Sequence, residues 1–181
     1  MDPVAIIARF YTPGSASHRI LLEHGRLVAE KALAAAARVL HLHPDLAFVA
    51  DAALLHDIGI YLTDSPGLGC VGKEPYIRHG VLGRRLLDEI GLPRLGLVCE
   101  RHIGVGISLE DIRRHRLPLP AREMLPLSIE EQIICFADKF FSKNGDGRPS
   151  REKSVESILE SLRPHGEDKV ERFRAWMALF A

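Results

Sequence analysis

The sequence has few cysteines and no thiolate motif. Cys70, Cys99 and Cys135 are its three cysteines, they lie far apart, and no two of them form a CxxC pair. Neither a disulfide framework nor a thiolate zinc site is therefore expected. Reduced thiols are typical of a cytoplasmic protein, which is the location we predict.

Long apolar runs and an excess of one charge are also lacking. No apolar run approaches the roughly 20 residues of a membrane span, and the start, MDPVAIIARF, has no basic region or cleavage site of a secretory signal. Lys plus Arg number 24, as do Asp plus Glu, so no overall field attracts nucleic acid or an anionic membrane. We expect neither partner.

The composition is that of a chain that folds by itself. Apolar residues make up 46% of the 181 residues and charged residues 27%, well away from disordered chains. This length suits one domain with a single core. We expect one domain over residues 1–181, with its main core in about 18–142 and C-terminal helices in 150–181 that pack on it.

Helical periodicity predominates along the chain, and there is no internal repeat or convincing alternating strand. Apolar residues recur at helical spacing in several segments. These are residues 18–40, 46–57, 75–90, 94–103, 128–141, 155–162 and 170–180. Ser128 and Glu131 form a capping-box pattern at the start of the fifth segment. The sequence therefore predicts an all-α protein, a bundle of about six to eight helices.

Three segments between these helices have loop character. Residues 61–74 contain glycines and a proline without periodicity, 107–127 contain LPLP, and the polar SKNGDGRPS at 142–150 ends the fifth helix. Within the second loop, Arg113, Arg114, His115 and Arg116 form a basic run. Such a run is usually a solvated face, with a phosphate-binding lid as the alternative.

Histidines and aspartates recur on the apolar stripes of the first five predicted helices. They are His24, His56 with Asp57 beside it, His79, His102 and Asp138. A single histidine in such a position is more often an ordinary core residue, but several buried imidazoles and carboxylates together need a compensating charge. A divalent ion of iron, manganese, cobalt or zinc would supply this charge, because these metals accept nitrogen and oxygen ligands together. Six ligands predict two ions.

The blocks around these residues resemble a known family. LLEHGRLVAE, LLHDIG, YIRHGVLG, CERHIGVG and CFADKF, in this order over about residues 18–142, are similar to the HD-domain phosphohydrolase superfamily. The resemblance implies a helical core with the site at its centre. It also implies that His24, His56, Asp57 and Asp138 hold one ion, while His79 and His102 hold a second, with Asp57 bridging.

The resemblance further implies metal-assisted hydrolysis, in which Asp57 and Asp138 orient or deprotonate the attacking water. Several binuclear members have a lysine directly after HDIG, where this chain has Ile60. Another cation must replace it, and candidates by proximity in sequence are Lys73, Arg78, Arg101 and Lys139. The cyclic-dinucleotide branch carries a GYP signature that this chain lacks, whereas the dinucleoside tetraphosphatase branch stays open.

Three functions therefore remain. The first is hydrolysis of a phosphomonoester or phosphodiester bond in a nucleotide or another small phosphorylated metabolite. The second is oxygen activation by a mixed-valence di-iron pair, which some superfamily members carry out with the same ligands. The third is a non-catalytic nucleotide-binding regulatory module, against which retention of all six ligands argues. The stripe that contains Trp176 is typical of a core face or a homodimer face.

Overall fold

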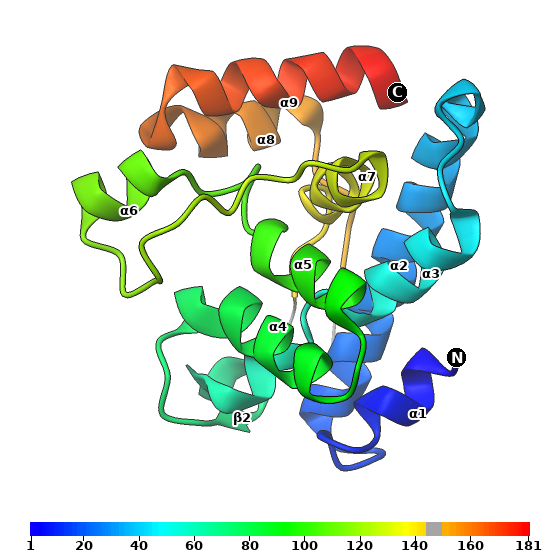
Figure 1. Cartoon of the computed structure of the whole chain (residues 1–181), viewed down its shortest axis with the longest axis vertical. Helices are drawn as coiled ribbons and strands as arrows, with labels where there is room; N and C mark the ends of the chain where they lie inside the picture. Colours follow the sequence, from blue (N-terminus) through cyan, green and yellow to red (C-terminus); the bar gives the residue numbers. More distant parts are fainter. Residues whose placement is uncertain (144–149) are drawn as a thin grey trace.

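The computed structural model describes residues 1–143 and 150–181, and it confirms the predicted all-α fold (Figure 1). The α-helices of these residues are α1 (Pro3–Ile7), α2 (Ala16–Arg38), α3 (Leu46–Leu55), α4 (His79–Glu89), α5 (Pro93–Arg101), α6 (Leu109–His115), α7 (Ile129–Asp138), α8 (Val155–Leu162) and α9 (Glu167–Phe180). Short 3-10 turns and one small antiparallel strand pair connect them. These are η1 (Leu40–Leu42), η2 (Ile58–Leu62), β1 (Asp64–Ser65), η3 (Pro66–Leu68), β2 (Cys70–Val71), η4 (Tyr76–Arg78) and η5 (Arg163–His165).

Three of the helices that carry the site, α2, α3 and α7, begin at residues whose side chains cap them. The side chains of Ser15 and Asp45 accept hydrogen bonds from backbone N–H groups in the first turns of α2 and α3. At α7 the predicted capping box is present, because Ser128 and Glu131 each accept a bond from the other's backbone N–H. These caps satisfy N–H groups that a helix start otherwise leaves unpaired, and so they fix where each helix begins.

The structure differs from the sequence prediction in its short elements. Two helices, α1 and α6, and the strand pair were not predicted. In α6 a second capping box, between Ser108 and Asp111, starts a helix of seven residues in which Ile112 is buried. Seven residues are too few for a recognisable apolar stripe. The polar segment that was predicted to end the fifth helix lies mostly at 144–149, outside the described residues, and α7 ends before it, at Asp138.

The helices form one layered bundle around the long helix α2. This helix packs against α3 and α7, and α4 lies beside α5 (Figure 1). At one end of the molecule α8 and α9 cover α7, where the ring of Phe136 lies 5.6 Å from that of Phe173 and 5.3 Å from that of Phe180. A single cluster of buried apolar residues runs from Ile6 to Phe180. The C-terminal helices therefore share the core that surrounds the site.

The segment around α6 has a small apolar cluster of its own. Its buried members are Ile107, Ile112 and Met124, which pack against one another. Two contacts tie this segment to α9, since Lys169 donates from Nζ to Asp111 Oδ2 over 2.6 Å and Arg172 donates to the carbonyl of Val105 over 2.9 Å. The neighbouring basic run, residues 113–116, is exposed, as expected of a solvated face.

Within the described residues, no helix has the length and apolar character needed to cross a bilayer.

Candidate metal centre

The six predicted ligands come from five helices and meet in the interior. His24 lies within α2, His79 begins α4, and Asp138 is the last residue of α7. His56 and His102 directly follow the last residues of α3 and α5 as their C-caps, and Asp57 follows His56. Five of the six are buried, with Asp138 partly exposed. The helix ends therefore bring together side chains that are up to 114 residues apart in sequence.

Gly59, the glycine of HDIG, permits the close approach that this requires. A Cβ at this position would collide with the backbone carbonyl of His79 and the backbone nitrogen of Gly83. Only glycine therefore lets η2 lie directly against α4. Tyr11 holds the same turn from the other side, because its hydroxyl donates to the carbonyl of Ile58 over 3.1 Å and accepts from the backbone N–H of Tyr61 over 2.9 Å.

The two carboxylate oxygens of Asp57 face two different pairs of histidines. Oδ2 lies 3.2 Å from Nε2 of His24 and 3.1 Å from Nε2 of His56. Oδ1 lies 3.4 Å from Nε2 of both His79 and His102. Asp57 thus belongs to both groups of side chains that could hold a metal ion.

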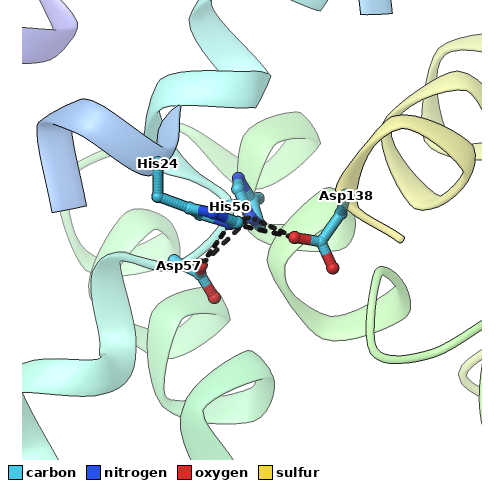
Figure 2. Close-up of side chains that lie close together, drawn as sticks. All are labelled: His24, His56, Asp57 and Asp138. Carbon is cyan, nitrogen blue, oxygen red and sulfur yellow. Dashed lines mark hydrogen bonds and ion pairs between the residues drawn. The ribbon is translucent and has the colours of Figure 1, made fainter. Parts of the chain in front are cut away.

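Asp138 completes the first group. Its Oδ1 lies 2.9 Å from Nε2 of His24 and 3.4 Å from Nε2 of His56 (Figure 2). Figure 2 shows His24 from α2 and Asp138 from α7 pointing toward each other, with Asp57 beside them. In each of the two groups the ligand atoms all lie within 4.8 Å of one another.

The orientation of the imidazole rings shows that a cation fits between these groups. The Nδ1 atoms of His56, His79 and His102 lie 2.7, 2.7 and 2.8 Å from the carbonyls of Ala53, Tyr76 and Cys99. A carbonyl only accepts, so each Nδ1 carries the proton and donates it. In neutral rings the Nε2 lone pairs then point at one another and at Asp57, whose oxygens have no hydrogen-bond partner in the described residues. Lone pairs gathered in a dry interior repel unless a cation lies among them.

The pKa values of four of the clustered side chains are shifted from their ordinary values in the same environment. Burial would lower the pKa of His56, but the carboxylates of Asp57 and Asp138 outweigh it and raise that pKa to about 10. Burial lowers the pKa of His79 to about 3, since Asp57 compensates it less. The pKa values of Asp57 and Asp138 lie well below their ordinary range despite burial, because cationic groups surround them. Both carboxylates are therefore ionised and available to bind metal.

One cation next to the centre escaped sequence reasoning. Nζ of Lys143 lies 2.7 Å from Oδ2 of Asp57, at ion-pair distance. Ile60, at the position where several superfamily members have lysine, lines the same small cavity as Lys143. Lys143 follows α7 in a polar stretch without periodicity, so the only available signal was its position five residues after Asp138.

The four cations predicted from the sequence lie in different surroundings. Lys73 is exposed in the loop before α4, and Arg78 pairs with Glu74 over 2.9 Å and donates to the carbonyl of Pro118. Arg101 makes two bonds to Glu131, of 2.9 and 3.0 Å. Lys139 is half-buried beside Asp138, and its charge, with burial and Lys143, lowers the pKa of Lys153. Within the described residues, none of these four side chains forms an ion pair or hydrogen bond with the clustered histidines and aspartates.

A cavity of about 650 Å³ opens beside the centre. Its lining in the described residues includes Ser65, Tyr76, Phe141, Ser142, Lys143 and Lys153. Two of these residues connect it to the ligands, since Lys143 contacts Asp57 and the ring of Tyr76 lies 4.7 Å from that of His79. Within the described residues, the wall of this cavity therefore contains two lysine side chains.

Comparison with known proteins identifies the family. The model of the HD domain matches residues 21–142, which include all six ligands. The chain belongs to the HD domain family. The sequence prediction of this family is thus confirmed, and the clustered histidines and aspartates can bind divalent metal ions, as the HD domain implies.

Three curated relatives extend this comparison. An uncharacterized protein of Methanocaldococcus jannaschii is 37% identical over 121 residues, which are 65% of this chain and 64% of the relative. The tRNA (cytidine(56)-2'-O)-methyltransferase of Thermoplasma volcanium is 34% identical over 154 residues, 84% of this chain and 39% of the relative. The enzyme of that name from Picrophilus torridus is 35% identical over 98 residues, 54% of this chain and 25% of the relative. The chain thus spans less than two thirds of each relative, and no solved structure matches it.

Proposed function

We propose that this HD domain is a metal-dependent phosphohydrolase that cleaves a phosphomonoester or phosphodiester bond of a nucleotide or another small phosphorylated metabolite. The observation that carries the proposal is the carboxylate of Asp57 between two pairs of inward-turned imidazoles. This arrangement suits two divalent ions of iron, manganese, cobalt or zinc. His24, His56, Asp57 and Asp138 would hold the first ion, and His79, His102 and Asp57 the second.

Bound ions would supply Lewis acidity and a water nucleophile that is ionised near neutral pH. The chain provides the remaining functions. Asp57 is fully buried and sets the charge of the centre, whereas the side chain of Asp138 is 15% exposed and faces solvent-accessible space. Asp138 is therefore the group that we propose accepts the proton of the nucleophile. Lys143 and Lys153, which line the cavity, would hold phosphoryl oxygens and neutralise charge that develops on them.

The cavity favours a small anionic substrate. Its volume of about 650 Å³ is that of an ordinary small-molecule site, and its lining in the described residues includes the cations Lys143 and Lys153. These cations argue against a neutral polyol as the substrate of a di-iron oxygenase, but an anionic hydroxyphosphonate would suit them as well as a phosphate ester, so oxygen dependence must separate the two functions. The methyltransferase relatives extend far beyond the segment they share with this chain, so their named activity does not support a different proposal for it.

Elemental analysis of the purified protein, followed by a phosphate-release screen, tests the proposal. Nucleotides and sugar phosphates would be supplied with manganese, iron or cobalt, aerobically and anaerobically. We expect about two ions per chain, as the two ligand groups require, and phosphate release that does not depend on oxygen. Oxygen consumption without phosphate release would instead identify the di-iron oxygenase, and the absence of bound metal would contradict the proposal.

Asp57→Ala is the decisive variant, with Asp111→Asn as its matched control. Asp57→Ala should lose both bound metal and phosphate release while the helical fold, measured by circular dichroism, persists. Asp111 is also an ion-paired carboxylate, but its partner is Lys169, far from the centre in sequence. Its variant should retain metal and activity. Full activity of Asp57→Ala would remove Asp57 from the mechanism.

A further inference from the structure

Lys143 occupies the position of a charge that the metal centre needs. Its Nζ lies 2.7 Å from Oδ2 of Asp57, and this is the oxygen that also faces His24 and His56. The lysine side chain is only 14% exposed, although an ammonium group is normally solvated. Asp57 and Asp138 together compensate this buried charge. The ammonium group therefore neutralises the first ligand group from within.

An ion held by the first ligand group would bind beside the same oxygen. Two cations on one carboxylate oxygen, in an interior that excludes water, repel each other strongly. The ammonium of Lys143 and a divalent ion thus compete for Asp57. The ammonium group approaches Asp57 at ion-pair distance, and the charges of Asp57 and Asp138 favour its position there.

The cavity beside the centre can accommodate the ammonium group of Lys143 when it moves away from Asp57. It lines the cavity of about 650 Å³ together with Tyr76 and Ser142, so rotation of its flexible stem turns the ammonium group into that space. Lys143 also lies beyond α7, where no helix hydrogen bonds fix its backbone. The displaced group would then face whatever fills the cavity.

We propose that Lys143 is a built-in counter-ion of the metal centre, which neutralises Asp57 until metal binds and is then displaced into the cavity, where it binds a phosphate group of the substrate. This inference rests on the metal centre of the proposed function. It couples metal loading to substrate binding, because the metal-free protein keeps its phosphate-binding cation engaged with Asp57.

The first experiment compares Mn²⁺ affinity in Lys143→Met and Lys153→Met by calorimetric titration. Lys153 lines the same cavity and carries the same charge, but no described contact joins it to Asp57. Removing the competitor should raise affinity in Lys143→Met by about ten- to a hundredfold, the range over which groups contacting metal ligands act. Lys153→Met should change affinity far less. Unchanged or weaker binding in Lys143→Met would overturn the proposal.

The second experiment uses the wild-type protein, so it does not depend on whether a variant folds. Lysine side chains are acylated briefly with acetic anhydride, with and without Mn²⁺, and the modification of Lys143 is followed by mass spectrometry. Metal should accelerate the labelling of Lys143 severalfold and leave that of exposed Lys73 unchanged. Equal or slower labelling of Lys143 in the presence of metal would show that it is not displaced.

Inorganic phosphate then tests the destination of the ammonium group. The metal-loaded wild-type protein should bind phosphate at least about tenfold more tightly than metal-loaded Lys143→Met, since a charge-assisted contact is lost. Equal binding would refute the role in the cavity. None of the three measurements requires turnover, so an inactive protein whose Lys143 is displaced by Mn²⁺ would contradict the proposed hydrolysis and leave this inference intact.

Discussion

Cys135 donates a hydrogen bond from Sγ to the backbone carbonyl of Arg101 over 3.3 Å, directly before the proposed ligand His102. Cys99 makes the same kind of bond, also of 3.3 Å, to the carbonyl of Leu55, directly before His56. Both thiols are fully buried, and burial raises their pKa values well above the ordinary one. The thiols therefore stay protonated, and each holds a helix end from which a ligand projects.

Replacing Cys135 by alanine should destabilise the protein and loosen His102. Loss of the thiol leaves a buried carbonyl with one partner fewer and a small cavity, which together cost about 1–3 kcal/mol. Urea unfolding measures the first effect and Mn²⁺ titration the second. Cys70→Ala is the control, because the Sγ of Cys70 has only a long contact of 3.9 Å to the carbonyl of Leu68. Equal losses in both variants would argue against this role of Cys135.

Gly59→Ala should disrupt the centre, whereas Gly67→Ala should not. The added methyl group at residue 59 would collide with the backbone of α4 at His79, so Asp57 and His79 could not both keep their positions. We expect a loss of stability of about 1–3 kcal/mol and weaker metal binding. A methyl group at residue 67 meets nothing within 4 Å. Thermal unfolding and metal analysis of the two variants provide the check, and normal metal content in Gly59→Ala would contradict this account.

Substitution of His79 or His102 by alanine should lower the metal content from about two ions toward one. Both face Oδ1 of Asp57, so the first group would retain its own four ligands. Substitution of His24 should affect the other ion instead. Elemental analysis after dialysis distinguishes these cases. If His79→Ala kept the wild-type metal content, His79 would be left with substrate contact as its role.

The metal-free protein should be most stable near pH 6.5. Because the pKa of His56 rises from 6.5 to about 10 on folding, its contribution is complete below 6.5 and is lost as the pH rises toward 10. Because the pKa of His79 falls from 6.5 to about 3, its contribution is lost as the pH falls below 6.5. Urea unfolding in the presence of a chelator, over about pH 5–9, would show the free energy of unfolding decrease on both sides of the maximum.

His56→Gln should abolish the decline in stability on the alkaline side. If the decline persisted, another titratable group would be its cause.

Metal binding must also remove the proton of His56. Affinity for Mn²⁺ should therefore increase with pH up to about 10, with protons released on binding.

The six clustered side chains could be singled out from the sequence because five helices each place a histidine or aspartate on an apolar stripe, with Asp57 beside one of them. An imidazole or carboxylate among residues such as Leu27 and Val28 conflicts with local burial, and a shared ion would resolve the conflict. Contacts between residues that are far apart in the sequence cannot be predicted from local spacing. Glu131 was predicted to cap α7, which it does, but the sequence did not indicate that it also binds Arg101 from α5. Lys143 lies outside any periodic segment, and its contact with Asp57 arises only in three dimensions.

The aromatic contact between α7 and α9 bears on how this protein can be shortened. The family match stops at residue 142, yet Phe136 and Phe140 turn their rings toward Phe173 on α9. A fragment trimmed to the match would leave these rings in water and would release Asp111 and Val105 from their lysine and arginine anchors. Such a fragment should aggregate or lose its hold on Asp138, which shares a helix with Phe136.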